Sequence, residues 1–293
     1  MKLNLVAQSI LAVGLISIMF GIGLSLLRQD FISLARSPRA LLVGLSAQII
    51  GLPAAGILVI LIADLPPEYA LGLLIIASSP GGATSNLFSY LMKADVALSV
   101  SLTAAATVIC TLTVPLTLAN ASGILLQQAT TVSIPAGKIL APLMVLVLLP
   151  LIVGMVVREK CPNWAQRMYR PTARLSVLLL ILTIGYVLYL EQSRLQDYLV
   201  ELGGVISLLF LLAIAIALLA SHLAGLRVRQ TKTILIEVGI QNGVQAMFVA
   251  TSPLIFNNTA MAIPAALYSI LMYLYMFLIY LLFRVWRTER RMS

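Results

Sequence analysis

Apolar stretches as long as a membrane-crossing helix run through nearly the whole chain, separated by short polar connections. Hydrophobic residues make up 61% of the 293 residues and charged residues only 10%, whereas a soluble domain carries about 25% charged residues. A helix that crosses a bilayer needs about 20 apolar residues, and a barrel strand only about 9–11. The sequence therefore predicts an all-α polytopic membrane protein whose surroundings are a lipid bilayer.

Nine of these stretches are predicted to cross the membrane. They are residues 8–27, 38–63, 69–92, 96–120, 136–158, 173–190, 202–223, 231–256 and 260–284. When the connections alternate between the two sides, 16 of the 19 Lys and Arg residues fall on one side, among them Arg174 at the start of the sixth stretch. Because cytoplasmic loops are enriched in Lys and Arg, we expect the N-terminus outside and the C-terminus in the cytoplasm.

The net charge of +9 is accounted for by this asymmetry, so no nucleic-acid partner is expected. The two cysteines, Cys110 in a predicted span and Cys161 in a basic connection, offer neither a disulfide framework nor metal-ligand spacing. No transit peptide is evident in the sequence. We therefore expect a prokaryotic inner (plasma) membrane.

Glu237 is an acidic residue inside a predicted apolar span, and the glycine-broken, amide-rich segment 239–243 follows it. A carboxylate in hydrocarbon is costly and persists only where it faces a partner, a cavity or a cation. An ion pair with Lys232 near the interface is the alternative, but the amide side chains beside Glu237 would then have no role. We interpret this segment as a break in the eighth helix whose oxygen atoms bind a cation.

A second polar interruption lies in the third span. Pro80 removes a backbone donor, Gly81 and Gly82 relax the backbone, and residues 84–86 (Thr, Ser, Asn) suit the start of a new helix. Freed backbone groups are tolerated in a bilayer only where they are buried in protein or line a wet cavity. A simple kink is the alternative, but the polar residues that follow and the second break favour a functional role.

Two broken spans indicate the midplane binding site of a secondary transporter. The carbonyl end of one half-helix suits a cation, and the amide end of the next suits an anion. Ser99 and Thr103 in the fourth span are four residues apart, so their hydroxyls share one face of the helix. Without the breaks nearby, these two residues would be interpreted as packing residues.

Three segments resemble, in the same order, motifs of the bile acid:sodium symporter family (BASS). They are residues 79–86 (Ser-Pro-Gly-Gly-Ala-Thr-Ser-Asn), residues 97–103 with Ser99 and Thr103, and residues 237–242 (Glu-Val-Gly-Ile-Gln-Asn). The resemblance covers roughly residues 8–285. It implies an inverted-repeat transporter with two crossed discontinuous helices, broken near 79–86 and 237–243. Nine spans resemble the animal members of the family, so the repeat would be four helices against five.

The resemblance also implies two domains and three groups of binding residues. The panel domain would comprise 8–27 and 136–190, and the core domain 38–120 and 202–284. The first sodium site would use Ser85, Asn86, Ser99, Thr103 and Glu237. The second would use the side chains of Gln48 and Gln241, together with Glu237 and the backbone carbonyls around Val238 and Ile240. The substrate would lie near Thr84, Asn86 and Asn242. Ala83 stands where the family often has a hydroxyl residue, and Met272 and Tyr273 lie on the last helix. These positions are expected to shape the substrate pocket, so the identity of the substrate stays open.

The expected function is a sodium-coupled symporter that imports a small or amphipathic organic anion, bile-acid-like or a small carboxylate, by alternating access. One Glu cannot neutralise two Na⁺, so about two Na⁺ per substrate leave a surplus positive charge that favours an anion, and no cofactor is expected beyond the coupling ion. The alternatives are a proton-coupled or efflux carrier of the same fold and a non-transporting membrane protein that senses a ligand. An enzyme is not expected, because no Ser/His, Asp/Asp or His/Glu/His arrangement occurs in the spans.

Overall fold

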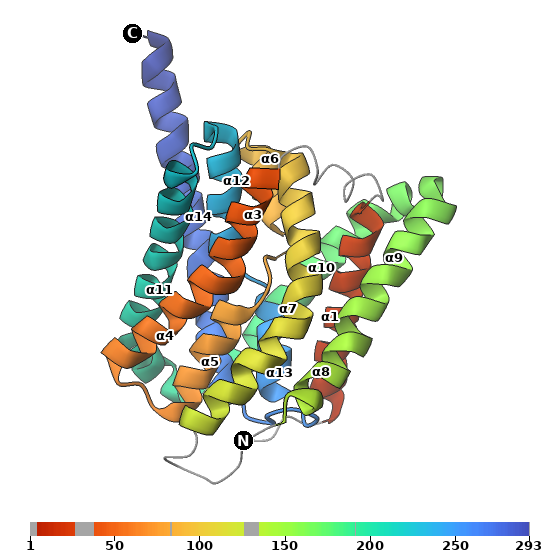
Figure 1. Cartoon of the computed structure of the whole chain (residues 1–293). Coiled ribbons are helices and arrows are strands. Elements are labelled where there is room, and N and C mark those ends of the chain that lie inside the picture. The colour runs from red at the N-terminus through yellow and green to blue at the C-terminus, as the bar shows by residue number, and fades with distance from the viewer. Residues whose placement is uncertain (1–4, 27–37, 83, 126–134, 191, 293) are drawn as a thin grey trace.

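The computed structural model describes residues 5–26, 38–82, 84–125, 135–190 and 192–292, and within these ranges the chain is helical and forms no strand (Figure 1). The helices are α1 (Leu5–Ser25), α3 (Pro38–Ser46), α4 (Leu52–Ala63), α5 (Pro67–Ser78), α6 (Thr84–Leu91), α7 (Val96–Leu125), α8 (Ala136–Leu143), α9 (Leu149–Lys160), α10 (Pro162–Leu190), α11 (Leu195–Leu223), α12 (Val228–Gly239), α13 (Gly243–Thr251) and α14 (Ile263–Met292). Single π-helical turns join α3 to α4 and α8 to α9.

Five helical segments in the described ranges are long and apolar enough to cross a membrane. They are Pro38–Ala63, Val96–Ala121, Ala136–Lys160, Gln196–Leu223 and Ala260–Arg284, and shorter apolar helices cover Leu11–Ser25, Pro67–Ser78 and Val177–Leu190. Large hydrophobic side chains point outward from them: Ile50 is 67% exposed and Leu61 is 76% exposed. Outward apolar side chains at helical spacing are what a lipid environment requires, and the prediction of a helical membrane protein is confirmed.

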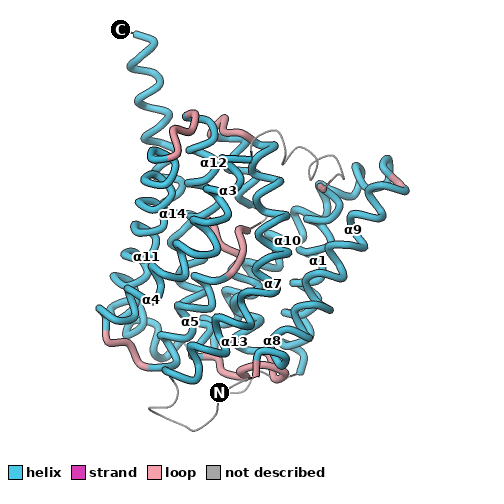
Figure 2. The backbone as a smooth tube through the Cα atoms, in the orientation of Figure 1, coloured by secondary structure: helices cyan, strands magenta, loops and turns pink. Residues whose placement is uncertain are grey.

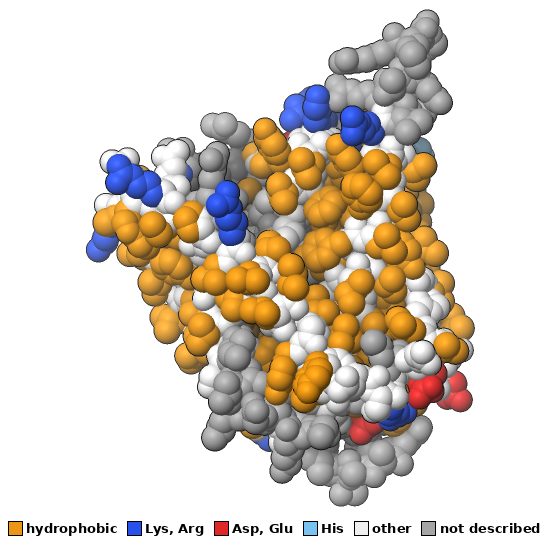
Figure 3. Space-filling model, turned by 180° about the vertical axis from the view of Figure 1, so that it is seen from behind, with side chains coloured by type: hydrophobic (Ala, Val, Ile, Leu, Met, Phe, Trp, Pro, Cys, Tyr) orange, Lys and Arg blue, Asp and Glu red, His pale blue; other side chains and the backbone are white. Residues whose placement is uncertain are grey.

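Charged side chains gather at the two ends of the molecule. Lys and Arg lie mainly toward the end from which α14 emerges, Asp and Glu lie toward the opposite end, and hydrophobic side chains cover the region between them (Figure 3). In Figure 1, α1 begins near the end opposite to that at which α14 finishes. The two ends of the molecule therefore differ in the sign of the charge that they carry.

The helices form two groups in Figure 1. Helix α1 packs along α9 and α10 on one side of the molecule, while α4, α5, α11 and α14 pack together on the other. Helices α7 and α13 lie between these groups, and α13 contacts both α1 and α14. The half-helix α13 of the broken helix α12–α13 therefore connects the two groups, because it also contacts α10.

The sequence underestimates the length of several helices. The predicted connection 159–172 is almost entirely helical, because α9 continues to Lys160 and α10 starts at Pro162. Proline is well suited to the first turn of a helix, where its missing N–H is not needed, and basic residues in the last turn of α9 complement the helix dipole. These helices therefore continue into polar sequence beyond the ends of their apolar stretches.

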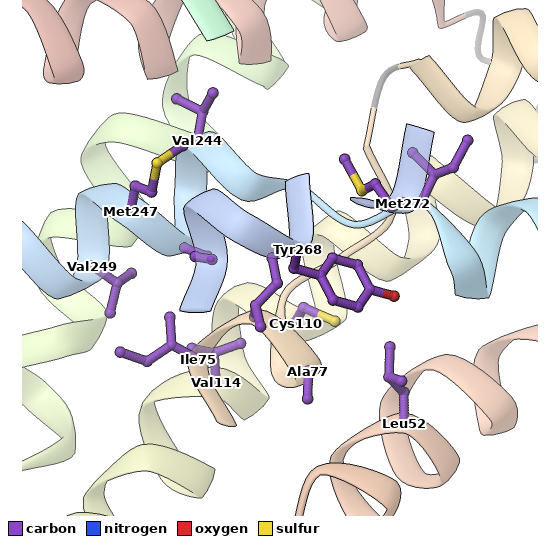
Figure 4. Close-up of a cluster of buried hydrophobic side chains, with 14 of the residues drawn as sticks. Leu52, Ile75, Ala77, Cys110, Val114, Val244, Met247, Val249, Tyr268 and Met272 are labelled. Carbon is purple, nitrogen blue, oxygen red and sulfur yellow. The ribbon is translucent and has the colours of Figure 1, made fainter. Parts of the chain in front are cut away.

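The helices around the breaks pack through a continuous cluster of buried hydrophobic side chains. Figure 4 shows part of it, with Leu52, Ile75, Val114, Met247 and Tyr268 among the residues drawn. The cluster draws on helices far apart in the sequence, so it fixes the half-helices relative to one another. Lipid tails are as apolar as these side chains, so the cluster holds the helices together through van der Waals packing rather than through removal of apolar surface from water.

Candidate functional site

The two breaks cross each other inside the helical body and pair through their backbones. The Gly82 N–H donates to the Ile240 carbonyl at 2.9 Å, the Asn242 N–H donates to the Pro80 carbonyl at 2.9 Å, and Gly81 and Gln241 form an isolated antiparallel bridge. Figure 2 shows the non-helical segment between α5 and α6 in the interior, whereas the other loops lie mainly at the two ends. Backbone groups freed by each break are thus partly satisfied by the other break, as the interior of a bilayer requires.

Two side chains of α14 form hydrogen bonds to the backbone of the second break. The Tyr268 hydroxyl donates to the Gly239 carbonyl at 3.1 Å, and the Met272 sulfur accepts from the Gln241 N–H at 3.3 Å. Both side chains are about 1% exposed. Met272 therefore stabilises the extended backbone at the crossing.

Glu237 lies at the centre of a buried cluster of hydroxyl groups and is itself only 3% exposed. Its Oε1 accepts hydrogen bonds from Ser85 at 2.7 Å and from Ser99, and its Oε2 accepts from Thr103 at 2.9 Å. These hydroxyls come from α6 and α7, while Glu237 belongs to α12. Lys232, the alternative partner suggested by the sequence, places its Nζ 4.5 Å from the centre of the Phe283 ring.

Asn86 completes the first predicted sodium set. It follows Ser85 on α6, and its buried Oδ1 has no hydrogen-bond partner among the described residues. A buried polar atom without a partner is uncommon and calls for a ligand, ion or water. The carboxylate and hydroxyls around Glu237 and the unpartnered amide oxygen of Asn86 are the oxygen types that a hard cation such as Na⁺ takes, so the residues present fit such an ion. The structure thus brings Ser85, Ser99 and Thr103 onto Glu237, and leaves Asn86 with a free acceptor.

The second predicted sodium set is brought together only in part. The Gln48 Nε2 donates to the Ser79 carbonyl at 2.9 Å and to the Gln241 Oε1 at 2.8 Å, and the Gln241 Nε2 donates to the Val238 carbonyl at 2.7 Å. The Ile240 carbonyl accepts the backbone bond from Gly82. Side-chain and backbone oxygens therefore converge around Gln48 and Gln241. The Glu237 carboxylate takes its three hydrogen bonds from the first set instead.

A cavity of about 380 Å³ opens beside the crossing. The three predicted substrate residues, Thr84, Asn86 and Asn242, all line it. So do Tyr273, whose hydroxyl shares a 2.8 Å hydrogen bond with that of Thr84, and Arg174 of α10. An apolar wall is contributed by α1 and α10 with Ile18, Ile22, Val177 and Leu180. The substrate residues of the sequence analysis thus share one cavity, which also takes in residues that it had not assigned to a site.

Asn242 caps α13 and keeps one polar group for the cavity. Its Oδ1 accepts from the Gln245 N–H at 3.1 Å, and its buried Nδ2 has no partner among the described residues. A side-chain oxygen that caps the first turn is the usual role of Asn at a helix start. The side chain is therefore held through its oxygen, and its Nδ2 remains an unsatisfied donor in the described part of the chain.

The residues that sequence reasoning missed at this site are Arg174, Ser79 and the residues of α1. Arg174 had been counted only as a cytoplasmic positive charge. Its spacing to Val177 and Leu180 is the sole sequence signal that these three side chains share a helix face. Ser79 contributes its backbone carbonyl, which accepts from Gln48. A role of the backbone cannot be recognised from the type of side chain.

The comparisons with known proteins agree with the motifs. A family model described as the sodium bile acid symporter family matches residues 12–201. A probable chloroplastic sodium/metabolite cotransporter of Arabidopsis thaliana is 32% identical over 270 residues, which is 91% of this chain and 65% of that protein.

Two further relatives carry related descriptions. An uncharacterized sodium-dependent transporter of Bacillus subtilis is 27% identical over 253 residues, covering 86% of this chain and 76% of that protein. The ileal sodium/bile acid cotransporter of Homo sapiens is 28% identical over 242 residues, covering 82% of this chain and 68% of that protein. The chain thus spans a little under two thirds of the Arabidopsis relative and somewhat more of the other two. The resemblance seen in the motifs is confirmed, and the chain belongs to the sodium bile acid symporter family.

Proposed function

We propose that the protein is a sodium-coupled symporter that imports an organic anion by alternating access, with about two Na⁺ per substrate. The observation that carries this proposal is the buried Glu237 carboxylate. It meets hydroxyls from two other helices at the crossing of two broken helices. A charge at this depth is expensive unless a cation or another compensating group accompanies it.

The first sodium site would be formed by Glu237, Ser85, Ser99, Thr103 and Asn86. In the cluster as it stands, the three hydroxyls donate to the carboxylate. A hydroxyl can rotate and offer a lone pair instead, so the same oxygens can turn toward a bound cation. The unpartnered Asn86 Oδ1 supports this assignment, because it is an acceptor that a cation would satisfy.

The second sodium site would lie around Gln48 and Gln241. Their amides contact each other and the carbonyls of Ser79 and Val238, so an ion that enters must turn the amide nitrogens away and the oxygens inward. A cation here would share the carboxylate of Glu237 with the first ion. This sharing would couple the two sites electrostatically.

The anion would bind in the cavity at the crossing. The half-helix α13 begins there, and the first amide groups of a helix favour negative charge. Two Na⁺ around one carboxylate leave a surplus positive charge beside the cavity. Sodium binding would therefore raise the affinity for the anion, and by linkage the anion would raise the affinity for sodium to the same extent.

Alternating access would arise from movement between two domains. The panel would comprise residues 8–27 and 136–190 and the core 38–120 and 202–284, with nine spans arranged as an inverted repeat of four helices against five. The separation of the α1–α10 group from the helices that carry the crossing supports this division (Figure 1). The charge asymmetry supports an N-terminus outside and a C-terminus in the cytoplasm, and the membrane would be a prokaryotic inner membrane.

The coupling is energetically sufficient. With a tenfold sodium gradient and about −100 mV, each Na⁺ supplies about 3.7 kcal/mol. Two ions supply about 7.4 kcal/mol, and importing a monovalent anion costs about 2.3 kcal/mol of electrical work. The remaining free energy of roughly 5 kcal/mol sustains an accumulation of several thousandfold.

Sodium-dependent thermal stabilisation of the purified protein tests the proposal. A ligand that binds the folded state raises the melting temperature by mass action. We expect NaCl, but not choline chloride at the same ionic strength and pH, to raise the melting temperature, and an organic carboxylate to raise it further only in sodium. Equal melting temperatures in the two salts would contradict sodium coupling and favour a proton-coupled carrier.

Gly81→Ala should weaken sodium binding because of the space that the new methyl group takes. A Cβ at Gly81 would lie 2.7 Å from the Glu237 Oε2, so the carboxylate must move. We expect the sodium concentration for half-maximal stabilisation to rise about tenfold or more, equivalent to a loss of about 1.4 kcal/mol or more of binding free energy. Gly204→Ala is the control, because a Cβ there meets nothing within 4 Å. A Gly81→Ala protein with wild-type sodium affinity would argue against a site at this carboxylate.

Asn86→Ala should raise the half-maximal sodium concentration by removing one oxygen ligand. The titration is done without an organic anion, since Asn86 also lines the cavity. We expect roughly a tenfold rise, in line with the loss of one interaction to a charged group. The exposed Asn120 on α7 provides the control Asn120→Ala. An unaltered sodium titration would remove Asn86 from the first site.

A further inference from the structure

Arg174 is placed on the wall of the cavity that faces the crossing. It lies on α10, and Val177 and Leu180, three and six residues further on, line the same cavity. Residues at this spacing share one face of a helix, so the cavity-facing side of α10 starts with the guanidinium group. Of the described residues that line the cavity, Arg174 is the one with a basic side chain.

The surroundings of Arg174 leave its charge available to a ligand. Among the residues that the structure describes, no acidic side chain lines the cavity, and no hydrogen bond or ion pair to the guanidinium is found. Its neighbours on this wall are the apolar residues Val177, Leu180, Ile18 and Ile22. Arg174 is itself exposed, so its charge stays solvated at the wall of the cavity and is open to an incoming anion.

The opposite wall offers a second donor. The Asn242 Nδ2 is buried without a partner in the described part of the chain, while its Oδ1 is held by the Gln245 N–H. A molecule in the cavity therefore meets a guanidinium on α10, and Asn242 at the start of α13 lines the same cavity. Arginine presents a planar fork of donors that matches a carboxylate in a bidentate pair. The amide N–H suits one further oxygen acceptor, such as a hydroxyl or keto oxygen.

We propose that Arg174 binds the carboxylate or sulfonate head of the transported anion, and that Asn242 binds a second oxygen of the same molecule. The inference rests on the proposed function and deepens it by naming the group that recognises the substrate charge. The substrate then bridges α10 and the crossing. Separation of these two walls breaks one of the two contacts, so movement of α10 releases the anion without disturbing the sodium ligands on α6, α7 and α12.

The test measures anion binding and sodium binding separately in Arg174→Gln, Arg174→Lys and Arg167→Gln. Arg167 is an exposed basic residue of the same helix that does not line the cavity, so its variant controls for the loss of one positive charge. The probes are pyruvate, pantoate and taurocholate, with the uncharged pantolactone as the neutral counterpart of pantoate. Each is titrated against the melting temperature of the purified protein at saturating sodium and in sodium-free buffer, and the best binder is then used for uptake into proteoliposomes.

We expect Arg174→Gln to raise the anion concentration for half-maximal stabilisation, and the KM for uptake, by about 10- to 100-fold, the usual effect of losing a hydrogen bond to a charged group. The sodium titration without anion should stay within about twofold of wild type. Arg174→Lys should lie between wild type and Arg174→Gln, Arg167→Gln should match wild type, and pantolactone should not distinguish the proteins.

Different results separate this inference from the proposed function. If Arg174→Gln binds every probe as wild type does, the inference is overturned while sodium coupling stands. If sodium has no effect on wild type but Arg174→Gln still loses anion binding, the coupling fails and the anion site survives. A wild type that none of the three anions stabilises would overturn the inference. A sodium titration that shifts as far as the anion titration would also do so, because Arg174 would then act on the whole fold.

Discussion

Glu237→Gln is expected to abolish sodium-dependent uptake while leaving a folded, correctly inserted protein. The amide has nearly the same shape as the carboxylate and keeps an oxygen that can accept from Ser85 or Ser99. It removes the only negative charge in the cluster, however, and leaves bound cations without compensation. Losing one partner of a buried charge pair costs about 3–5 kcal/mol, so sodium affinity should fall more than a hundredfold.

The measurement is uptake into proteoliposomes with an imposed sodium gradient, together with the melting temperature of the variant. Glu201→Gln on the exposed part of α11 is the matched control, since it removes a carboxylate far from the cluster. Sodium-driven uptake at the wild-type rate in Glu237→Gln would show that this carboxylate is no ion ligand. Loss of uptake with a melting temperature far below wild type would instead indicate a structural role.

Gln48→Leu should convert transport from electrogenic to electroneutral. Leucine removes the amide oxygen of the second sodium site, and it leaves the Ser79 carbonyl and the Gln241 Oε1 without the donor that they now share. One Na⁺ with one monovalent anion carries no net charge. About 3.7 kcal/mol is then set against 2.3 kcal/mol of electrical work, so the accumulation falls from several thousandfold to roughly tenfold.

The experiment imposes potassium diffusion potentials of several sizes on proteoliposomes. Uptake at each potential is compared with uptake when no potential is imposed. Wild type should respond to voltage and depend on sodium with a Hill coefficient near two, whereas Gln48→Leu should ignore voltage and show a coefficient near one. Gln192→Leu, at an exposed position, controls for the change of side chain. Voltage-dependent uptake in Gln48→Leu would contradict a role for Gln48 in the second ion site.

The positions of the two breaks could be predicted from sequence because they rest on local chemistry. Pro80 and the glycines beside it cannot continue a regular helix, and α5 ends at Ser78 as expected. Asn242 and Gly243 likewise mark the start of α13. Glu237 was singled out because a carboxylate among apolar residues requires explanation wherever it occurs, whereas Ser85, Ser99 and Thr103 were expected beside it only because of the family resemblance. Local signals of this kind survive without knowledge of the tertiary fold.

The remaining features depend on packing that a sequence does not display. Gln48 reaches Gln241 from a π-helical turn at Ala47–Gly51, and such a turn shifts the face of every residue that follows. Arg174 was interpreted as a marker of the cytoplasmic side, since its place in the chain says nothing about which helix it faces. The contact between Thr84 and Tyr273 joins residues 189 positions apart. No pattern in either helix indicates that pairing.

Equilibrium binding of radioactive sodium to the purified protein shows whether the Glu237 carboxylate holds sodium ions, since it counts the bound ions without requiring a known substrate. The number of sodium ions bound per protein is measured by equilibrium dialysis for wild type and for Glu237→Gln. Choline chloride is present in excess to keep the ionic strength constant. We expect close to two Na⁺ bound per wild-type protein and essentially none per Glu237→Gln protein. Two ions bound by both proteins, or none bound by wild type, would contradict it.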